Sequence, residues 1–355
     1  MIDQNHAEAL QSRLGADWPH LRAARKAATQ KLDSLREALA PFEVPDTSIV
    51  VFGSLARLEF TSESDIDWTL LLDGASVPEH LDTAIAIANK LAELENKKPG
   101  REGTFGSLAP SHDLIHYIGG EDDTNSNTTR RSLLLLESKP LLNSEAYDRV
   151  RGNLLKRYLQ EDGGLWRDSN SFKVPHFLLN DFARYWRTMT VDFAYKQRSR
   201  ANEGFALRNI KLRMSRKLIF IAGLLACFKC HLHLNGDEKE AQRIYRKDNL
   251  LEIVSSMRET FTHTPLDILA LVLSDYESLY PSVRNLFAAY DAFIGILADK
   301  AKRDRLSELK PDEFERDPIY KEAREISHSF RKAIEEIFLH PTNEIGELTI
   351  RFGVF

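Results

Sequence analysis

The chain has 355 residues and a formal net charge of −5, from 48 Lys and Arg against 53 Asp and Glu. A hydrophobic content of 43% and a charged content of 28% are ordinary for a globular protein and exclude a disordered, collagen-like or disulfide-scaffolded chain. Because only two cysteines are present, we expect a reducing compartment, and the length favours two domains.

The longest apolar run is LIFIAGLLACF, which is far shorter than the roughly 20 residues that a membrane-spanning helix needs. The first residues, MIDQNHAEALQSRLG, show no basic stretch followed by an apolar one, so no secretory signal is predicted. We therefore expect a cytoplasmic protein with no membrane insertion.

The first part of the chain alternates between helical and strand-like patterns. Periodicity and composition predict, in chain order, a helix, two strands, a helix, a Gly- and Pro-rich loop and a third strand, over residues 3–39, 48–52, 65–72, 78–96, 97–111 and 112–118. This order predicts a small mixed-sheet α+β domain, which we place at residues 1–140.

The rest of the chain favours helix almost throughout. Helices are expected over residues 129–137, 144–160, 176–200, 205–228, 237–257, 266–273, 281–302 and 318–338. The last ten residues, GELTIRFGVF, are apolar and alternating and form the one later strand candidate. We expect an all-helical domain over residues 141–355.

Two carboxylates at strand spacing are the most informative feature. Asp65 and Asp67 would point to the same side of a strand, where they repel each other unless a cation lies between them. Hard divalent cations prefer such oxygen ligands. Asp113, which opens the third predicted strand, would complete a two-metal site, with Glu121, Asp122 or Asp123 as alternatives.

A phosphate-binding turn is predicted beside these carboxylates. Gly53 ends the first predicted strand, and a residue without Cβ lets backbone N–H groups and the Ser54 hydroxyl approach a phosphate closely. Arg57 follows in the same turn and is a further nucleotide-binding candidate. Phosphate and metal would then meet at one edge of the sheet.

The run GSLARLEFTSESDIDW, a Gly-Ser followed by Asp-Ile-Asp, resembles the DNA polymerase β-type nucleotidyltransferase superfamily. It is especially similar to bacterial nucleotidyltransferases related to the domain that uridylylates PII signal proteins. The resemblance implies transfer of a nucleoside monophosphate from an NTP or dNTP, with release of pyrophosphate. Two Mg²⁺ or Mn²⁺ ions would be held by the catalytic carboxylates Asp65, Asp67 and Asp113.

Positive charge is concentrated in residues 182–217, which carry ten basic and two acidic side chains. In this superfamily a Lys and a Ser or Arg on a helix after the sheet commonly hold the β- and γ-phosphates. Lys211 and Ser215 resemble those residues, and the spacing adds Arg208 to the same helix face. Arg184 belongs to a polar stripe on the preceding predicted helix. The nucleotide is expected between the two domains.

The concentrated basic segment favours a polyanionic acceptor or product, such as an oligonucleotide. The layout and the segment HDLIHYIGGEDDTNSNTTRRSLLLLES also resemble antiphage nucleotidyltransferases of the Hailong type. That resemblance implies short DNA oligomers, an effector protein from a defence operon as partner, and possible priming by a hydroxyl of the tail or of Tyr320. Alternatives are nucleotide transfer onto a protein and a noncatalytic nucleotide-binding partner protein.

Overall fold

The structure, a computed structural model, describes residues 5–95, 108–161, 174–199, 203–232 and 250–353. The chain divides into two compact units by spatial contact. We call residues 24–161 with 250–264 the sheet unit, and residues 1–23, 162–249 and 265–355 the helical unit. Each is described by itself, and the expected domain boundary at residue 140 stays a prediction.

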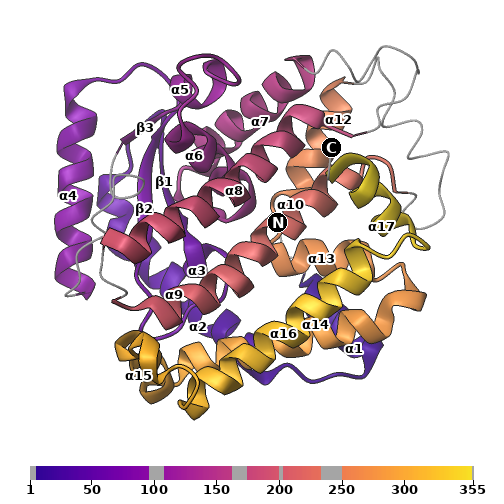
Figure 1. Ribbon diagram of the computed structural model, residues 1–355. Helices are drawn as coiled ribbons and strands as arrows, with labels where there is room; N and C mark the ends of the chain where they lie inside the picture. The colour runs from indigo at the N-terminus through magenta and orange to yellow at the C-terminus, as the bar shows by residue number, and fades with distance from the viewer. Residues whose placement is uncertain (1–4, 96–107, 162–173, 200–202, 233–249, 354–355) are drawn as a thin grey trace. The chain divides into compact units, whose positions relative to one another are not determined.

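The sheet unit is built on a four-stranded mixed sheet in the order β3-β2-β1-β4. Its strands are β1 (Thr47–Phe52), β2 (Asp67–Leu72), β3 (Leu108–Pro110) and β4 (Ser138–Leu142). β1 is antiparallel to both β2 and β4, whereas β2 and β3 are parallel (Figure 1). The predicted α+β fold with a small mixed sheet followed by a helical region is confirmed.

One face of this sheet carries the main hydrophobic core. Side chains of β1 and β2 pack there against α2 (Pro19–Leu39) and α4 (Pro78–Glu95). Trp68 lies at the centre and is fully buried. Because neighbouring residues of a strand face opposite sides, Ile66, Trp68 and Leu70 fix the direction of every other side chain in this segment.

The opposite face is covered by α6 (Asn125–Leu136), whose Leu133 and Leu134 lie over Phe52 and Thr69 around a small apolar cavity. α5 (Ser111–His116) and α7 (Ser144–Glu161) pack beside it. α12 (Leu250–Thr260), which is distant in sequence, packs on α7. A hydrogen bond from the Arg151 guanidinium to the Phe261 carbonyl holds the end of that helix.

The predicted strand over residues 112–118 is wrong. Residues Ser111–His116 form α5, because Pro110 ends the short strand β3 and buried Ser111 and Leu114 are spaced by three, as one side of a helix requires. β3 itself lies within the predicted loop, most of which falls outside the described residues. β4 was not predicted, since it is an edge strand interrupted by Pro140.

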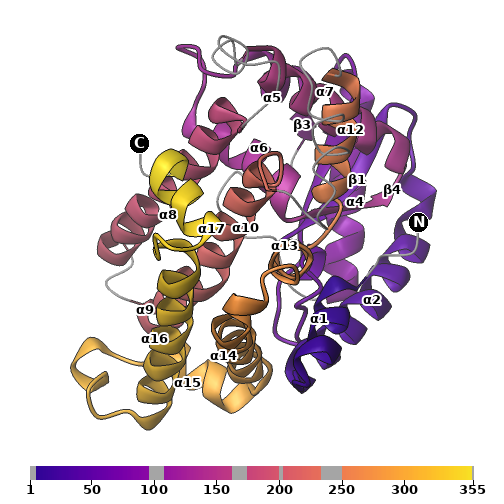
Figure 2. The same cartoon turned by 90° about the vertical axis from the view of Figure 1, so that its right-hand side faces the viewer.

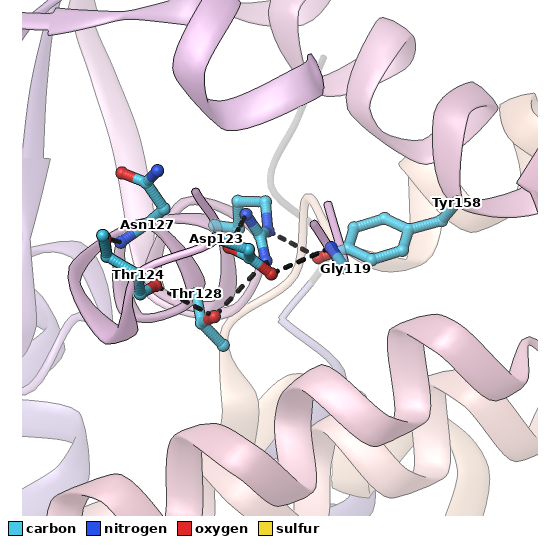
Figure 3. A network of polar contacts seen from close by, with 7 residues as sticks. Gly119, Asp123, Thr124, Asn127, Thr128 and Tyr158 are labelled. Atoms are coloured by element: carbon cyan, nitrogen blue, oxygen red, sulfur yellow. Dashed lines mark hydrogen bonds and ion pairs between the residues drawn. The ribbon is translucent and has the colours of Figure 1, made fainter. Parts of the chain in front are cut away.

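The polar segment that leads into α6 folds onto itself. Asp123 accepts two hydrogen bonds of 2.9 Å from the fully buried Arg131 guanidinium, and one of 3.0 Å from the Gly119 N–H (Figure 3). The Arg131 Nε donates to the Tyr158 hydroxyl at 2.9 Å. Thr124 caps the helix by accepting from the Asn127 N–H. A capping and pairing role therefore accounts for these residues.

The helical unit contains α1, α8 to α10, and all elements after residue 265. In chain order they are α1 (His6–Leu14), α8 (His176–Ser199), α9 (Phe205–Lys211), η3 (Leu212–Arg216), α10 (Lys217–Phe228), α13 (Pro265–Leu273), η5 (Glu277–Leu279), α14 (Tyr280–Ala298), α15 (Lys300–Glu308), η6 (Pro311–Glu313), α16 (Pro318–Phe338), α17 (Glu344–Leu348) and η7 (Thr349–Gly353). Gly15, with a positive φ, separates α1 from α2, where one helix was predicted.

Two further features of the helical unit bear on the sequence predictions. The strand predicted in the last ten residues is wrong, because the described part of that segment is helical. It belongs to α17 and to the π-helical turn η7. α9, η3 and α10 follow one another without a break, and η3 is a π-helical turn. α10, which contains the longest apolar run, is buried along almost its whole length. Within the described ranges, no helix combines the length and apolar character needed to cross a bilayer.

Replacing Arg131 by Met should destabilise the sheet unit by about 3–5 kcal/mol, because it leaves the buried Asp123 carboxylate without its cation. Urea unfolding followed by circular dichroism measures the change. The matched control is Arg22→Met, which removes an ion pair of similar length whose side chains are 51% and 68% exposed and should cost less than about 1 kcal/mol. Equal losses of stability in the two variants would contradict a structural role for the buried pair.

Candidate active site

The Gly53-Ser54 turn and Asp67 meet where β1 ends and β2 begins. Phe52 pairs with Asp67 in the antiparallel register, so the residue after Phe52 lies directly beside the aspartate. Gly53 has φ +67°, and a Cβ placed on it would lie only 2.9 Å from the Asp67 Oδ2. Two observations therefore favour glycine at this position. The positive φ is a conformation that other residues rarely adopt, and the Asp67 carboxylate occupies the space next to where a Cβ would lie.

Asp65 and Asp67 lie on the side of the chain opposite to the core. Ile66 and Trp68 are buried in the hydrophobic cluster, whereas Asp65 is exposed and Asp67 half-buried. The segment before them is fixed by a turn in which the Ser64 N–H donates to the Thr61 carbonyl at 2.9 Å and the Ser64 hydroxyl accepts from the Thr61 N–H. This turn sets where β2 begins, at Asp67 rather than at the predicted Asp65.

These groups form a donor set suited to a hard divalent cation. Asp65 and Asp67 supply carboxylate oxygens and half-buried Ser54 a hydroxyl. Mg²⁺ in proteins commonly takes one or two carboxylates and completes its shell with water and substrate phosphates. Over the described parts of the chain, no three His, Cys, Asp or Glu side chains gather closely enough to bind a metal by themselves. The two aspartates thus fit a cation that a phosphate substrate helps to hold.

The structure does not bring Asp113 to this pair. β3 runs parallel to β2, and its last residue, Pro110, pairs with Leu72 at the opposite end of β2 from Asp67. Asp113 lies in α5, which follows Pro110 directly, and it interacts electrostatically with Arg130. Among the described residues, it does not gather with Asp65 and Asp67 closely enough to hold a metal ion. Burial of the Arg130 guanidinium lowers its pKa and the Asp113 carboxylate opposes that shift. Of the alternatives, Asp123 is paired with Arg131, and Glu121 and Asp122 are exposed.

Arg57 is engaged in a buried charge cluster that the sequence reasoning missed. Its Nε donates to Glu59 at 2.8 Å, and its Nη1 donates to Glu137, the residue between α6 and β4. All three side chains are at least nine-tenths buried. The cluster ties the turn after α3 (Gly53–Ala56) to the start of β4, and contact of Arg57 with a nucleotide stays a prediction.

The other predicted nucleotide-binding residues belong to the helical unit. Arg184 is half-buried in α8. The Arg208 guanidinium donates to the Glu203 and Gly204 carbonyls at the start of α9. Lys211 is half-buried at the end of α9, and Ser215 is buried within the π-helical turn η3. Their contact with a nucleotide stays a prediction.

Comparison with known families agrees with the geometry of the sheet unit. Residues 32–100 match the nucleotidyltransferase domain family. The matched range contains Gly53, Ser54, Arg57, Asp65 and Asp67, whereas Asp113 and the predicted residues of the helical unit lie outside it. No curated protein matches the chain.

Gly53→Ala should weaken Mn²⁺ binding by about tenfold or more, because the added methyl displaces a carboxylate that it would otherwise touch. Manganese titration followed by electron paramagnetic resonance measures the affinity. Gly15→Ala is the matched control: Gly15 also has a positive φ, +57°, but nothing lies within 4 Å of its added Cβ. Both variants should lose about 1–2 kcal/mol of stability from backbone strain, and only the first should lose metal affinity. Unchanged Mn²⁺ affinity in Gly53→Ala would contradict the assignment.

Proposed function

We propose that the chain transfers a nucleoside monophosphate from an NTP or dNTP to an acceptor hydroxyl, with release of pyrophosphate. The observation that carries the proposal is the position of the Asp67 carboxylate, 2.9 Å from where a Cβ of Gly53 would lie. It supports a site in which a turn open to phosphate stands beside carboxylates that can bind a metal. The family match over residues 32–100 supports the same reaction class. Nucleotidyltransferase domains generally use a divalent metal and an NTP.

In the proposed site Asp65 and Asp67 hold Mg²⁺ or Mn²⁺, and the metal supplies positive charge to the phosphate oxygens and lowers the barrier to displacement at phosphorus. The Gly53-Ser54 turn positions the substrate, because the missing Cβ leaves space beside Asp67 and the Ser54 hydroxyl can donate to a phosphate oxygen. The acceptor hydroxyl loses its proton to water as its oxygen bonds to the α-phosphorus. The bond from that phosphorus to the bridging oxygen breaks, and pyrophosphate leaves with both electrons of that bond.

For the acceptor we propose the 3′-hydroxyl of an oligonucleotide, so that the product is an extended chain. The support is the concentration of positive charge in residues 182–217, which suits repeated phosphates better than a cationic small molecule. A role in antiphage defence rests on the layout of the chain and on the resemblance of residues 112–138. The structure accounts for much of that segment by the Asp123–Arg131 pair and the Thr124 cap.

Asp65→Asn and Asp67→Asn should each lower pyrophosphate release by about a hundredfold or more, since each removes a charged metal ligand. The assay incubates the full chain with each NTP and dNTP plus Mg²⁺ or Mn²⁺. Asp73→Asn is the matched control, because Asp73 follows the other end of β2 and pairs with the exposed Arg149. It should retain nearly full activity. Activity that survives both substitutions in the pair would contradict the proposal.

The same reactions, run with labelled nucleotides, separate the acceptors. A ladder of products means extension of an oligonucleotide, whereas label retained on the polypeptide means transfer onto protein. Asp113→Asn should reduce turnover much less than Asp67→Asn, because among the described residues Asp113 does not gather with Asp65 and Asp67 closely enough to hold a metal ion. A loss in Asp113→Asn equal to that in Asp67→Asn would restore the three-carboxylate site predicted from the sequence.

A further inference from the structure

A strongly basic groove of about 710 Å³ lies on the helical unit, between α16 and the segment formed by η3 and the first residue of α10. Figure 2 shows α16, in yellow, alongside α9, the helix that leads into η3. The charged side chains that line the groove are five cations and one acid: Arg213, Lys217, Lys321, Arg324, Arg331 and Glu325. The groove therefore concentrates positive charge on a chain whose net charge is negative.

Protein carboxylates neutralise only part of this charge. Arg324 pairs with Glu315 at 2.8 Å, and Arg331 pairs with Glu335 at 2.9 Å, both as exposed ion pairs. Within the part of the chain that the structure describes, Arg213, Lys217 and Lys321 make no ion pair or side-chain hydrogen bond. Exposed ion pairs are weak and exchange readily with a competing anion. All five cations are thus available to a ligand.

The pKa of Lys217 reflects its burial and the positive charge of its surroundings. Its pKa is lowered first by burial and then by the nearby positive charges of Arg331 and Arg213, which outweigh the opposing effect of Glu335. Like charges held together in this way repel one another, and a bound anion would convert that repulsion into attraction. Arg213 lies within the π-helical turn η3, and Lys217 follows it directly. A π-helical turn of this kind frequently marks a functional site.

We propose that this groove, which is lined by residues of the helical unit alone, is a phosphate-binding site for a nucleotide or short oligonucleotide. Its volume is in the range of sites that take molecules of nucleotide size. Arginine forks at positions 213, 324 and 331 match phosphate oxygens in pairs, and the two lysines add point charges. No Phe, Tyr or Trp is among the described residues that line the groove, so recognition is through phosphates and not through base stacking.

The test is equilibrium binding to the full chain in the presence of a chelator, so that neither metal nor turnover contributes. The probes are inorganic tripolyphosphate, ATP and a fluorescent single-stranded DNA oligomer of mixed sequence, with poly-glutamate as a carboxylate polyanion. We expect the phosphate probes to bind and poly-glutamate to bind more weakly, with affinity that falls as salt rises. For the oligomer, three to five phosphate contacts give a logarithmic slope of about −2 to −3.5.

Removing two groove cations in Lys321→Ala/Arg324→Ala should weaken the preferred phosphate probe by about tenfold or more and make the salt slope shallower by about 1.4. Both side chains are exposed, so the fold is expected to persist, and circular dichroism checks it. The matched control is Lys332→Ala, which removes an exposed lysine of the same helix that lines the neighbouring groove between α14 and α16. It should leave binding nearly unchanged.

The outcomes separate the sources and keep the proposal apart from the enzymatic one. If tripolyphosphate and ATP bind with similar affinity and the DNA oligomer binds weakly, the groove is assigned to a nucleotide. If the DNA oligomer binds more tightly than tripolyphosphate and ATP, the groove is assigned to an oligonucleotide. Asp67→Asn should bind these probes as the wild type does, even if it has lost all turnover. Equal losses in the double variant and in Lys332→Ala, or equal binding of poly-glutamate, would overturn the proposal.

Discussion

The absence of a side chain at Gly53 is the constraint on which the candidate active site depends. The antiparallel register places this residue beside Asp67, and the carboxylate comes within 2.9 Å of where a Cβ would be. Any other residue would have to adopt a positive φ and push the aspartate away at the same time. One backbone position thus couples the end of β1 to the start of β2, and the turn proposed to bind phosphate to the carboxylates proposed to bind metal.

Buried ion pairs hold the surroundings of this contact in place. Arg57 is enclosed with Glu59 and Glu137, and Arg131 with Asp123, and these pairs fix the segments that flank α3 and α6. Burying such charges costs free energy of desolvation, which the attraction within a close pair offsets. The pairs therefore hold the neighbouring segments in position more than they add to the net stability of the fold. Charged residues near the candidate active site can therefore act on the fold itself, by holding the turn and the strand ends in place.

Local patterns predicted the elements that are both regular and central. β1, β2 and the helices that cover them follow from apolar runs and helical spacing, and Asp65, Ile66, Asp67 and Trp68 alternate as a strand implies. The segment HDLIHYI also alternates, but burial at Ser111 and Leu114 shows a helix, and only tertiary packing decides between the two periods. The edge strand β4 contains Pro140, and its sequence, SKPLL, does not show the alternation of apolar and polar residues that predicts a strand. The role of Arg57 was hidden because Glu137 lies eighty positions away.

Charge composition hid the basic groove for a related reason. Residues 182–217 stand out in the sequence, but α16 carries four basic and four acidic side chains and so has no net charge of its own. Folding separates part of those charges. Glu322 pairs with Lys302, and Glu336 accepts from Ser282. Glu325 and Glu335 stay beside the groove, where Lys321, Arg324 and Arg331 lie opposite Arg213 and Lys217. A surface that attracts phosphate therefore arises from two helical segments about a hundred residues apart, only one of which is basic on average.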